Sequence, residues 1–310
     1  MQRSIDGRFI PPKRFKTHQL TEEDEFLSED ELKQEIKLEI SRRIHSEDIK
    51  IPMISHVASK VMQASNDPNI SAAQIASIIK QDQQIAGKVI QIANSPVYAG
   101  LTKVTSIQRA ITQIGMRALR DLIYGIAMGS TIFRSKEFKE LMNEMWTHSL
   151  SVGYIAQQVA EQIWIDSEYA FLCGLMHDVG KPLILDVITG IKRKSPEKLF
   201  LTDDSLNEII DEFHQDVGGL VARAWDFPEQ LHEAITMHHR YSESKDPQMA
   251  QLVYFADVLY YYMGIGNLEK EVDPYQDRTV RDLALDAQKM EILIAKLETE
   301  VPSFLIGFMG

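Results

Sequence analysis

The sequence has little cysteine and no long apolar run. A single cysteine among 310 residues, Cys173, excludes an internal disulfide and is typical of a reducing compartment. The first residues do not have the pattern of a secretory leader, and the apolar stretch from Leu252 to Gly266 is too short to span a bilayer and contains Asp257. We therefore expect a cytoplasmic protein with no membrane partner.

The sequence also has too little positive charge for a typical nucleic-acid-binding protein. Its formal net charge of -12 repels a phosphate backbone. The two basic clusters, Lys13 to Lys16 and Lys192 to Lys194, are short. We therefore expect no nucleic-acid partner.

Signals for β-strands are almost absent. β-branched residues rarely alternate with polar ones, and the one Asp-Gly pair, Asp6-Gly7, is not flanked by the alternating apolar residues of a hairpin. Helix signals are frequent: capping boxes at Ser28 and Ser71, and an apolar residue at every fourth position from Leu32 to Ile44. The fold class predicted from these patterns is all-α.

The predicted helices include several that bear on the later argument. The first runs from Ser28 to about His45 and serves as an extension or a dimer contact. Another contains His214 and is capped by Ser205 with Glu208. A loop from Gly264 to Asp277 is expected to precede a last helix from about Thr279 to Glu298.

Histidines and carboxylates are concentrated in one part of the chain. Six of the nine histidines lie between His148 and His239. Neutral imidazole and ionised carboxylate are the ligands that Zn, Fe or Mn ions take. The predicted metal ligands come from several helical segments: Glu144, His148, His177, Asp178, His214, His238, His239 and Asp257.

Two of these residues have a specific geometric expectation. Glu144 and His148 are four residues apart within a helical run from Lys136 to about Gln162, so both project from one face. Glu144 is predicted either to bind the metal or to hydrogen-bond to a ligand. Asp178, at a helix end beside His177, is placed to bridge two ions.

Other residues in the same region have simpler interpretations. Lone histidines are more often hydrogen-bonded core or surface residues than ligands, and we interpret His18, His45, His56 and His232 in that way. Cys173 is predicted to be a core residue, and Tyr260 to Tyr262 to pack on different faces of a helix. Lys181 is either a cation near a helix C-terminus or a group that holds a phosphate oxygen.

The motif His177-Asp178-Val179-Gly180-Lys181 resembles the one that names the HD superfamily of metal-dependent phosphohydrolases. Further motifs resemble the HDOD family, the HD-related output domains of bacterial signalling. They are Ile51-Pro52, Asp67-Pro68, Asp82, Ala93-Asn94-Ser95, Ile107 to Gly115, Trp146 with His148-Ser149, and Trp225 with Pro228. The resemblance runs from about Ile51 to Gly264 and implies a two-lobed helical fold, with an N-terminal helical bundle and a C-terminal HD-like bundle.

The expected organisation has four parts. Residues 1–27 form a tail or linker, residues 28–50 an N-terminal extension helix, residues 51–135 the N-terminal helical lobe, and residues 136–310 the HD-like metal-binding lobe with a C-terminal helix.

The ligand order is similar to that of the HD-GYP cyclic-dinucleotide phosphodiesterases. The resemblance implies two divalent transition-metal ions (Fe, Mn, Zn or Ni) bridged by Asp178. It assigns one ion to His148, His177 and Asp257, the other to His214, His238 and His239, an additional ligand role to Glu144, and a phosphate-holding role to Lys181. The Gly-Tyr-Pro signature is absent, because His239 is followed by Arg240-Tyr241-Ser242, which disfavours cyclic di-GMP as the substrate.

Two functions remain open at this stage. The first is a phosphodiesterase-like phosphohydrolase of bacterial signalling that acts on a phosphodiester or nucleotide, with Asp178 and Lys181 as catalytic residues. The second is a non-catalytic output module that acts through a protein partner, with a structural or sensory metal. Self-association as a homodimer is compatible with both.

Overall fold

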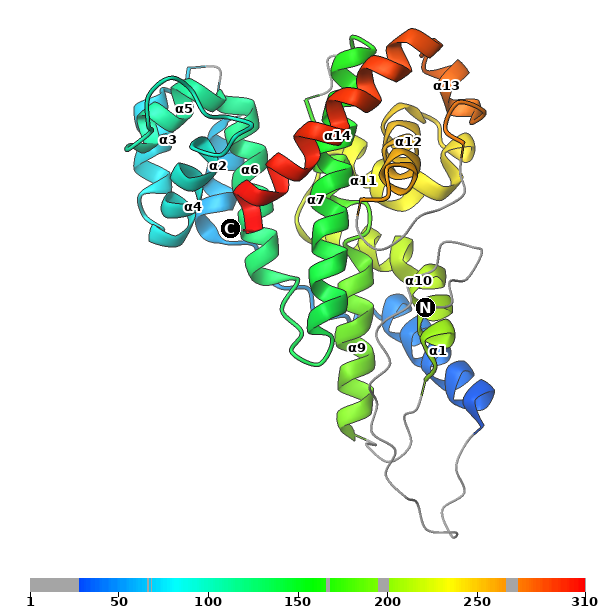
Figure 1. The fold of residues 1–310 in the computed structure, drawn as a ribbon. Coiled ribbons are helices and arrows are strands. Elements are labelled where there is room, and N and C mark those ends of the chain that lie inside the picture. The colour runs from blue at the N-terminus through cyan, green and yellow to red at the C-terminus, as the bar shows by residue number, and fades with distance from the viewer. Residues whose placement is uncertain are drawn as a thin grey trace.

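The structure is a computed structural model that describes residues 28–65, 67, 69–165, 168–194, 201–265 and 273–309. Within these ranges the chain forms helices and no strands, so the all-α prediction is confirmed. Figure 1 shows two groups of helices side by side, joined by a long central helix and a C-terminal helix. The predicted tail, residues 1–27, lies outside the described residues.

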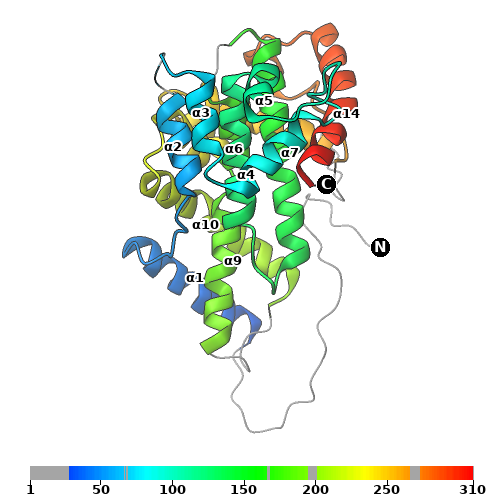
Figure 2. The same ribbon diagram turned by 90° about the vertical axis from the view of Figure 1, so that its left-hand side faces the viewer.

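The first group, called the N-terminal bundle here, consists of five helices around an aliphatic core. They are α2 (His56–Ser65), α3 (Ala72–Ile79), α4 (Gln83–Ala93), α5 (Ile107–Ile114) and α6 (Met116–Thr131). The second view places them on one side of the molecule (Figure 2). Their buried side chains are mainly isoleucine, valine and alanine, which form a separate hydrophobic cluster.

Several motif residues act locally in this bundle. Ser71 and the side chain of Gln74 form the predicted capping box of α3, and Asp82 caps α4 by accepting from the backbone of Gln84 and Ile85. The amide of Asn94 binds the backbone N–H and C=O of Val104 at 2.8 and 2.9 Å. These contacts satisfy backbone groups that the ends of short helices leave without partners.

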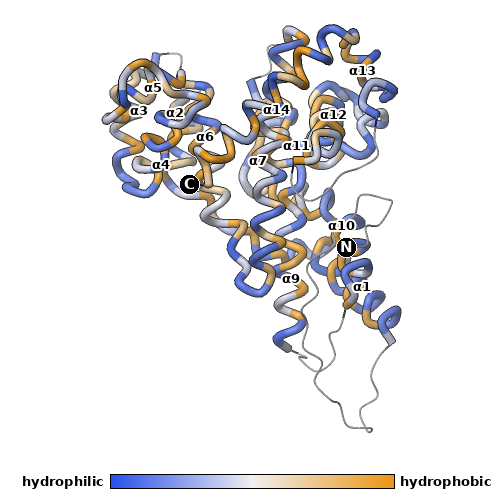
Figure 3. The backbone as a smooth tube through the Cα atoms, in the orientation of Figure 1, coloured by the Kyte–Doolittle hydropathy of each residue, from blue (hydrophilic) through white to orange (hydrophobic). Residues whose placement is uncertain are grey.

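The second group, called the C-terminal bundle, contains the longer helices. It consists of α7 (Lys139–Gln162), α8 (Ala170–Met176), α9 (Gly180–Lys194), α10 (Asp203–Ala224), α11 (Glu229–Met237), the 3₁₀ helix η2 (His238–Glu243), α12 (Gln248–Tyr262), α13 (Arg278–Asp282) and α14 (Ala287–Met309). Figure 3 shows hydrophobic residues recurring along these helices, and many of their apolar side chains are buried in one shared core. No helix in the described part of the chain is long and apolar enough to cross a membrane.

Helix α6 belongs to both cores. Leu119 and Ile123 are buried in the N-terminal bundle, whereas Leu122 and Met128 are buried in the larger core of the C-terminal bundle. A helix that is apolar on two faces is buried on two sides. The two bundles are therefore packed against each other along α6.

A buried arginine on α6 links the two bundles at this contact. Arg120, which is 2% exposed, donates to the carboxylate of Asp121 at 3.0 Å and to the carboxylate and the backbone C=O of Glu168, both at 2.7 Å. Its guanidinium also lies 5.2 Å from the ring centre of Tyr169. Arg120 thus connects the N-terminal bundle to the residues that lead into α8, and no sequence pattern predicts this contact.

The predicted extension helix is α1 (Glu29–His45), and the capping box of Ser28 with Glu31 is present. Its apolar stripe is buried against this same chain, next to α9 and α10 (Figure 1). Lys33 and Lys37 bind Glu208 of α10 at 2.9 and 2.6 Å. The helix therefore braces α10, which also carries His214.

Two local predictions were wrong. The N-cap of α10 is Thr202, and Ser205 lies inside the first turn, where its hydroxyl donates to Glu29 at 2.6 Å. The last predicted helix is two helices, since Ala284 adopts a positive φ of 53° between α13 and α14. Helix α14 then continues past Pro302, because its later apolar residues are buried against the rest of the chain.

Candidate metal centre

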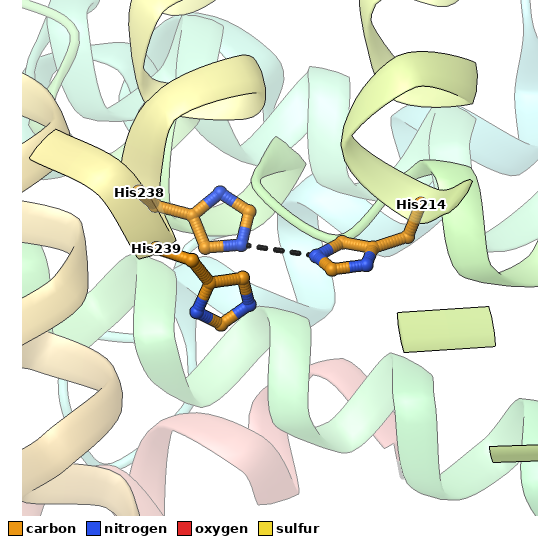
Figure 4. Close-up of side chains that lie close together, drawn as sticks. All are labelled: His214, His238 and His239. Carbon is orange, nitrogen blue, oxygen red and sulfur yellow. Dashed lines mark hydrogen bonds between the residues drawn. The ribbon is translucent and has the colours of Figure 1, made fainter. Parts of the chain in front are cut away.

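The predicted ligands gather at one place in the C-terminal bundle. One set, called the Asp178 group, consists of His148, His177 and Asp178, and the other, called the histidine triad, consists of His214, His238 and His239. Within each set, one candidate ligand atom per residue lies within 4.8 Å of the others. Figure 4 shows His238 and His239, from the end of α11 and the start of η2, facing His214 of α10.

Glycines allow the helices to approach closely enough for this. A Cβ atom at Gly174 would lie 2.6 Å from the backbone oxygen of Val152, and one at Gly153 would lie 2.9 Å from the backbone oxygen of Phe171. Helices α7 and α8 therefore pack with their backbones in contact. This brings His148 of α7 next to His177, which follows α8.

Glycines also allow α10 to approach α9 and α11 closely. A Cβ atom at Gly180 of α9 would lie 2.0 Å from the backbone oxygen of His214, and one at Gly218 of α10 would lie 2.5 Å from the side chain of Ile235 of α11. The glycine of the His177-Asp178-Val179-Gly180 motif thus sets the distance between Asp178 and the histidine triad.

Backbone carbonyls fix the protonation of three imidazoles. Nδ1 of His177 lies 2.7 Å from the C=O of Gly174, Nδ1 of His214 lies 2.9 Å from that of Asp211, and Nδ1 of His238 lies 3.0 Å from that of Ala234. A carbonyl accepts only, so each Nδ1 must carry the proton and donate. In a neutral ring, Nε2 then has a free lone pair that points into the site.

The charge state of the histidine triad is consistent with this arrangement. Burial lowers the pKa of His214 to about 3. Burial also takes the pKa of His238 well below its ordinary value, and the pKa of His239 is lowered mainly for the same reason. At neutral pH the triad therefore consists of neutral imidazoles, which is the form that binds metal ions.

The spacing of the donors fits a cation. Nε2 of His214 and Nε2 of His238 are 3.3 Å apart, so two lone pairs face each other without a proton between them. Two nitrogen ligands on a tetrahedral ion are roughly 3.3 Å apart when each metal–nitrogen bond is about 2.05 Å. A cation that binds both nitrogens would turn this repulsion into attraction.

Asp178 lies between the two sets and has one oxygen toward each. Its Oδ2 lies 3.2 Å from Nε2 of His177 and 3.4 Å from Nε2 of His148. Its Oδ1 lies 3.6 Å from Nε2 of His214 and 3.7 Å from Nε2 of His238, is buried, and accepts no hydrogen bond from the described residues. A buried carboxylate oxygen without a donor is costly unless a cation is bound to it.

Asp257 of α12 completes the Asp178 group from the opposite side. Its Oδ1 lies 3.4 Å from Nε2 of His148, and this oxygen too is buried and accepts no hydrogen bond within the described chain. Nε2 of His148 also lies 3.2 Å from Nε2 of His177. The residues that the resemblance assigns to the first ion are therefore in mutual contact.

Lys181 lies directly beside the bridging carboxylate. Its ammonium is 2.7 Å from Oδ2 of Asp178. Burial acts to raise the pKa of Asp178, but His177 and Lys181 outweigh it, so the net pKa lies well below the ordinary value. Asp178 is therefore ionised at neutral pH, as a metal ligand must be.

The remaining residues named from the sequence lie outside the two sets. Glu144 is on α7, one turn before His148, and belongs to neither set of three. His45, His56 and His232 also belong to neither, and His18 lies outside the described residues. Cys173 is fully buried, as predicted.

Two aromatic residues near the site were predicted only as packing residues. The ring centre of His148 lies 4.6 Å from that of Tyr260, at 89°, and 5.8 Å from that of Tyr261. They cover one side of the His148 ring. Alternation of consecutive residues around a helix does not reveal such a contact, because it depends on how α12 packs on α7.

Comparison with known proteins gives the same picture of the fold. A protein from Shewanella amazonensis, described as a proposed metal-dependent phosphohydrolase, has a TM-score of 0.70 at 20% identity, with 89% of this chain and 99% of that chain covered. An HDOD domain protein of unknown function from Geobacter sulfurreducens has a TM-score of 0.67 at 22% identity, with coverages of 89% and 98%. At these identities the likeness shows the fold alone.

Relatives found by sequence comparison match a smaller share of this chain than the solved structures do. An uncharacterized protein of Treponema pallidum is 22% identical over 200 residues, which are 61% of this chain and 37% of that protein. Ribonuclease Y of Aquifex aeolicus is 27% identical over 132 residues, which are 43% of this chain and 19% of that enzyme. The match thus spans well under half the length of these relatives.

The HDOD domain model matches residues 51–241, which include the N-terminal bundle and the C-terminal bundle as far as η2. All six residues of the two sets lie within this range, and Asp257 lies beyond it. Because the match covers more than half of the chain, the chain belongs to the HDOD family.

Proposed function

We propose that this protein is a bacterial signalling protein whose C-terminal bundle holds two divalent transition-metal ions and hydrolyses a phosphate ester of a small molecule. The observation that carries the proposal is the position of Asp178, with one carboxylate oxygen toward the Asp178 group and the other toward the histidine triad. A single carboxylate between two sets of imidazole ligands is a donor arrangement for two ions.

The residues divide the work as follows. His148, His177 and Asp257 would hold one ion, and the histidine triad would hold the other, with Asp178 shared. Two bound ions would supply Lewis acidity and an activated water for attack on phosphorus. Lys181 would neutralise charge on the phosphate oxygens, since its ammonium is already at the edge of the site.

Exposure favours one direction of approach for a substrate. His239 is the exposed member of the histidine triad, whereas His214 and His238 are buried. A phosphate ester would therefore reach the site on the His239 side, near Lys181, whose side chain is 19% exposed.

The rival function is a non-catalytic output module that binds a protein partner. It is favoured by the N-terminal bundle, where no group of three metal-binding residues occurs among the described residues. A protein of Marinobacter aquaeolei that is described as a proposed signal transduction protein has a similar fold, with a TM-score of 0.65 at 16% identity over 90% of this chain and 66% of that one. Under this function the metal is structural or sensory.

The test is hydrolysis of bis(p-nitrophenyl) phosphate by protein reconstituted with Fe, Mn, Zn or Ni. We expect activity in the parent and a loss of about 10³-fold or more in Asp178→Ala, because both ions lose their shared ligand. His45→Ala, which changes an exposed histidine of α1, is the matched control and should keep full activity.

The two functions give different outcomes. Metal-loaded parent protein that hydrolyses neither this ester nor a panel of nucleotide phosphodiesters would contradict the catalytic proposal. If Asp178→Ala also still complements deletion of the gene, the output-module function is supported instead.

A further inference from the structure

His239 differs from the other imidazoles of the site in how it is held. The rings of His177, His214 and His238 each donate from Nδ1 to a backbone carbonyl. The ring of His239 makes no hydrogen bond with any residue that the structure describes, and it contacts His238 and His214 only through ring packing at 4.2 and 5.1 Å. Its position therefore depends on the backbone of η2.

That backbone has little regular structure of its own. Helix η2 is a short 3₁₀ helix, and Arg240, directly after His239, leaves helical geometry with φ -131° and ψ 33°. Short 3₁₀ helices have poorer hydrogen-bond geometry than α-helices. The segment needs contacts from outside to keep one conformation.

One such contact is a hydrogen bond that joins the residue after η2 to helix α11. The hydroxyl of Ser244 donates to the carboxylate of Glu233 at 2.5 Å, and the two residues are 11 positions apart. His238 and His239 are at the middle of the chain between them. The same hydroxyl accepts from the backbone N–H of Asp246 at 3.1 Å, and the N–H of Ser244 donates to the C=O of Tyr241 at 3.1 Å.

A second contact holds η2 from the other side. The ring of Tyr241 packs on that of Tyr254 of α12, with centres 5.2 Å apart, and the hydroxyl of Tyr254 donates to Asp277 at 3.2 Å. Tyr241 is thus held against α12 while Ser244 is held against α11. The backbone that carries His239 lies between the end of α11 and Tyr241, so both contacts restrict its freedom.

We propose that Glu233 and Ser244 are positioning residues that fix η2 and thereby keep His239 in place as a ligand of the second metal ion. The inference rests on the proposed metal site, and it adds two residues that contact neither ion nor substrate. Loss of the Ser244 hydroxyl should weaken the ion bound by the histidine triad and leave the ion bound by the Asp178 group unchanged.

The test is titration of metal-free protein with Co²⁺, followed by its visible absorption, which reports the two binding events. In Ser244→Ala we expect the ion at the histidine triad to lose about 10- to 100-fold in affinity, the range for residues that orient a ligand, while the other ion keeps its affinity. Ser242→Ala is the matched control, because Ser242 is exposed on the same 3₁₀ helix and makes none of these contacts. Ser244→Thr, which keeps the hydroxyl, should restore the affinity.

A second pair of variants, at Glu233, tests the same hydrogen bond if Ser244→Ala does not fold. Glu233→Ala removes the acceptor, whereas Glu233→Gln keeps an oxygen that accepts from Ser244, so only the former should resemble Ser244→Ala. Hydrogen exchange of metal-free protein should show faster exchange in residues 238–244 for Ser244→Ala than for Ser242→Ala, with residues 170–181 unchanged.

The outcomes separate this inference from the proposed function. A parent that binds two Co²⁺ ions, with Ser244→Ala equal to Ser242→Ala in both affinity and exchange, overturns the role of Ser244 and leaves the metal site standing. A parent that binds no second ion overturns both.

Discussion

The two bundles of this protein bury different kinds of side chain. The core of the N-terminal bundle is aliphatic, and the buried charges on its helices, Arg120 and Asp121, are at the contact with the other bundle. The C-terminal bundle buries His177, Asp178, His214 and His238 in its interior. Buried polar groups of this kind lower stability unless they are paired or bind a ligand, so their presence marks the C-terminal bundle as the place of the candidate metal centre.

The difference also indicates how the bundles depend on each other. The N-terminal bundle has its own apolar core, but α6 contributes residues to both cores, and Arg120 holds the segment before α8. Helix α8 leads directly to His177 and Asp178. We therefore expect changes along α6 to affect both bundles.

The largest effect is expected from Arg120→Ala. Removing one partner of a buried ion pair leaves Asp121 buried without its cation, which lowers the free energy of unfolding by about 3–5 kcal/mol. Urea denaturation measures the change. Arg134→Ala, an exposed arginine just beyond α6, is the control and should change stability little. Equal stability of both variants would show that Arg120 does not stabilise the contact between the two bundles.

The second largest loss of stability is expected when alanine replaces a glycine at a close contact between helices rather than a glycine with open space around it. Gly180→Ala would place a methyl group 2.0 Å from the backbone oxygen of His214, so we expect a loss of about 1–3 kcal/mol or more, together with weaker metal binding. Gly190→Ala on the same helix and Gly87→Ala in the N-terminal bundle meet no atom within 4 Å.

The two control variants should be neutral or gain up to about 1 kcal/mol, because alanine favours a helix over glycine. Thermal unfolding and metal content of all three variants check the comparison. A Gly180→Ala variant with normal metal content would contradict the close packing of α9 on α10.

The smallest effect concerns α1, which is braced by exposed charges. Hydrogen bonds from Lys37 and Lys33 lower the pKa of Glu208 from 4.5 to about 2. A carboxylate with a lowered pKa in the folded state stabilises the fold above pH 4.5, and this contribution is lost as the pH falls toward 2. Parent and Glu208→Gln should therefore differ slightly in thermal midpoint at pH 6, and the difference should vanish near pH 2 or in 1 M salt. A difference that grows on acidification would contradict this sign.

The sequence was sufficient for the fold class and for several helix ends. Capping boxes at Ser28 and Ser71 and the stripe from Leu32 to Ile40 depend only on residues close in sequence, and the structure contains each of them. The cap of α10 and the break at Ala284 were missed. At the start of α10 a contact distant in sequence matters, because the hydroxyl of Ser205 donates to Glu29.

For the candidate site too, the sequence was sufficient for the identity of the residues but not for their arrangement. Residue types and the order of motifs led to the histidines and aspartates, because ligand chemistry is a property of single residues. The orientation of Asp178 between the two sets, the Arg120 ion pair and the Glu233–Ser244 hydrogen bond all depend on how helices pack, so no local pattern could predict them.

The most direct test of the central claim is the metal content of untagged protein purified without chelators, measured by elemental analysis with His45→Ala and Asp178→Ala beside the parent. The account predicts about two transition-metal ions per chain in the parent and in His45→Ala, and a clear loss in Asp178→Ala. Little or no metal in the parent, unchanged after reconstitution with Fe, Mn, Zn and Ni, would contradict it.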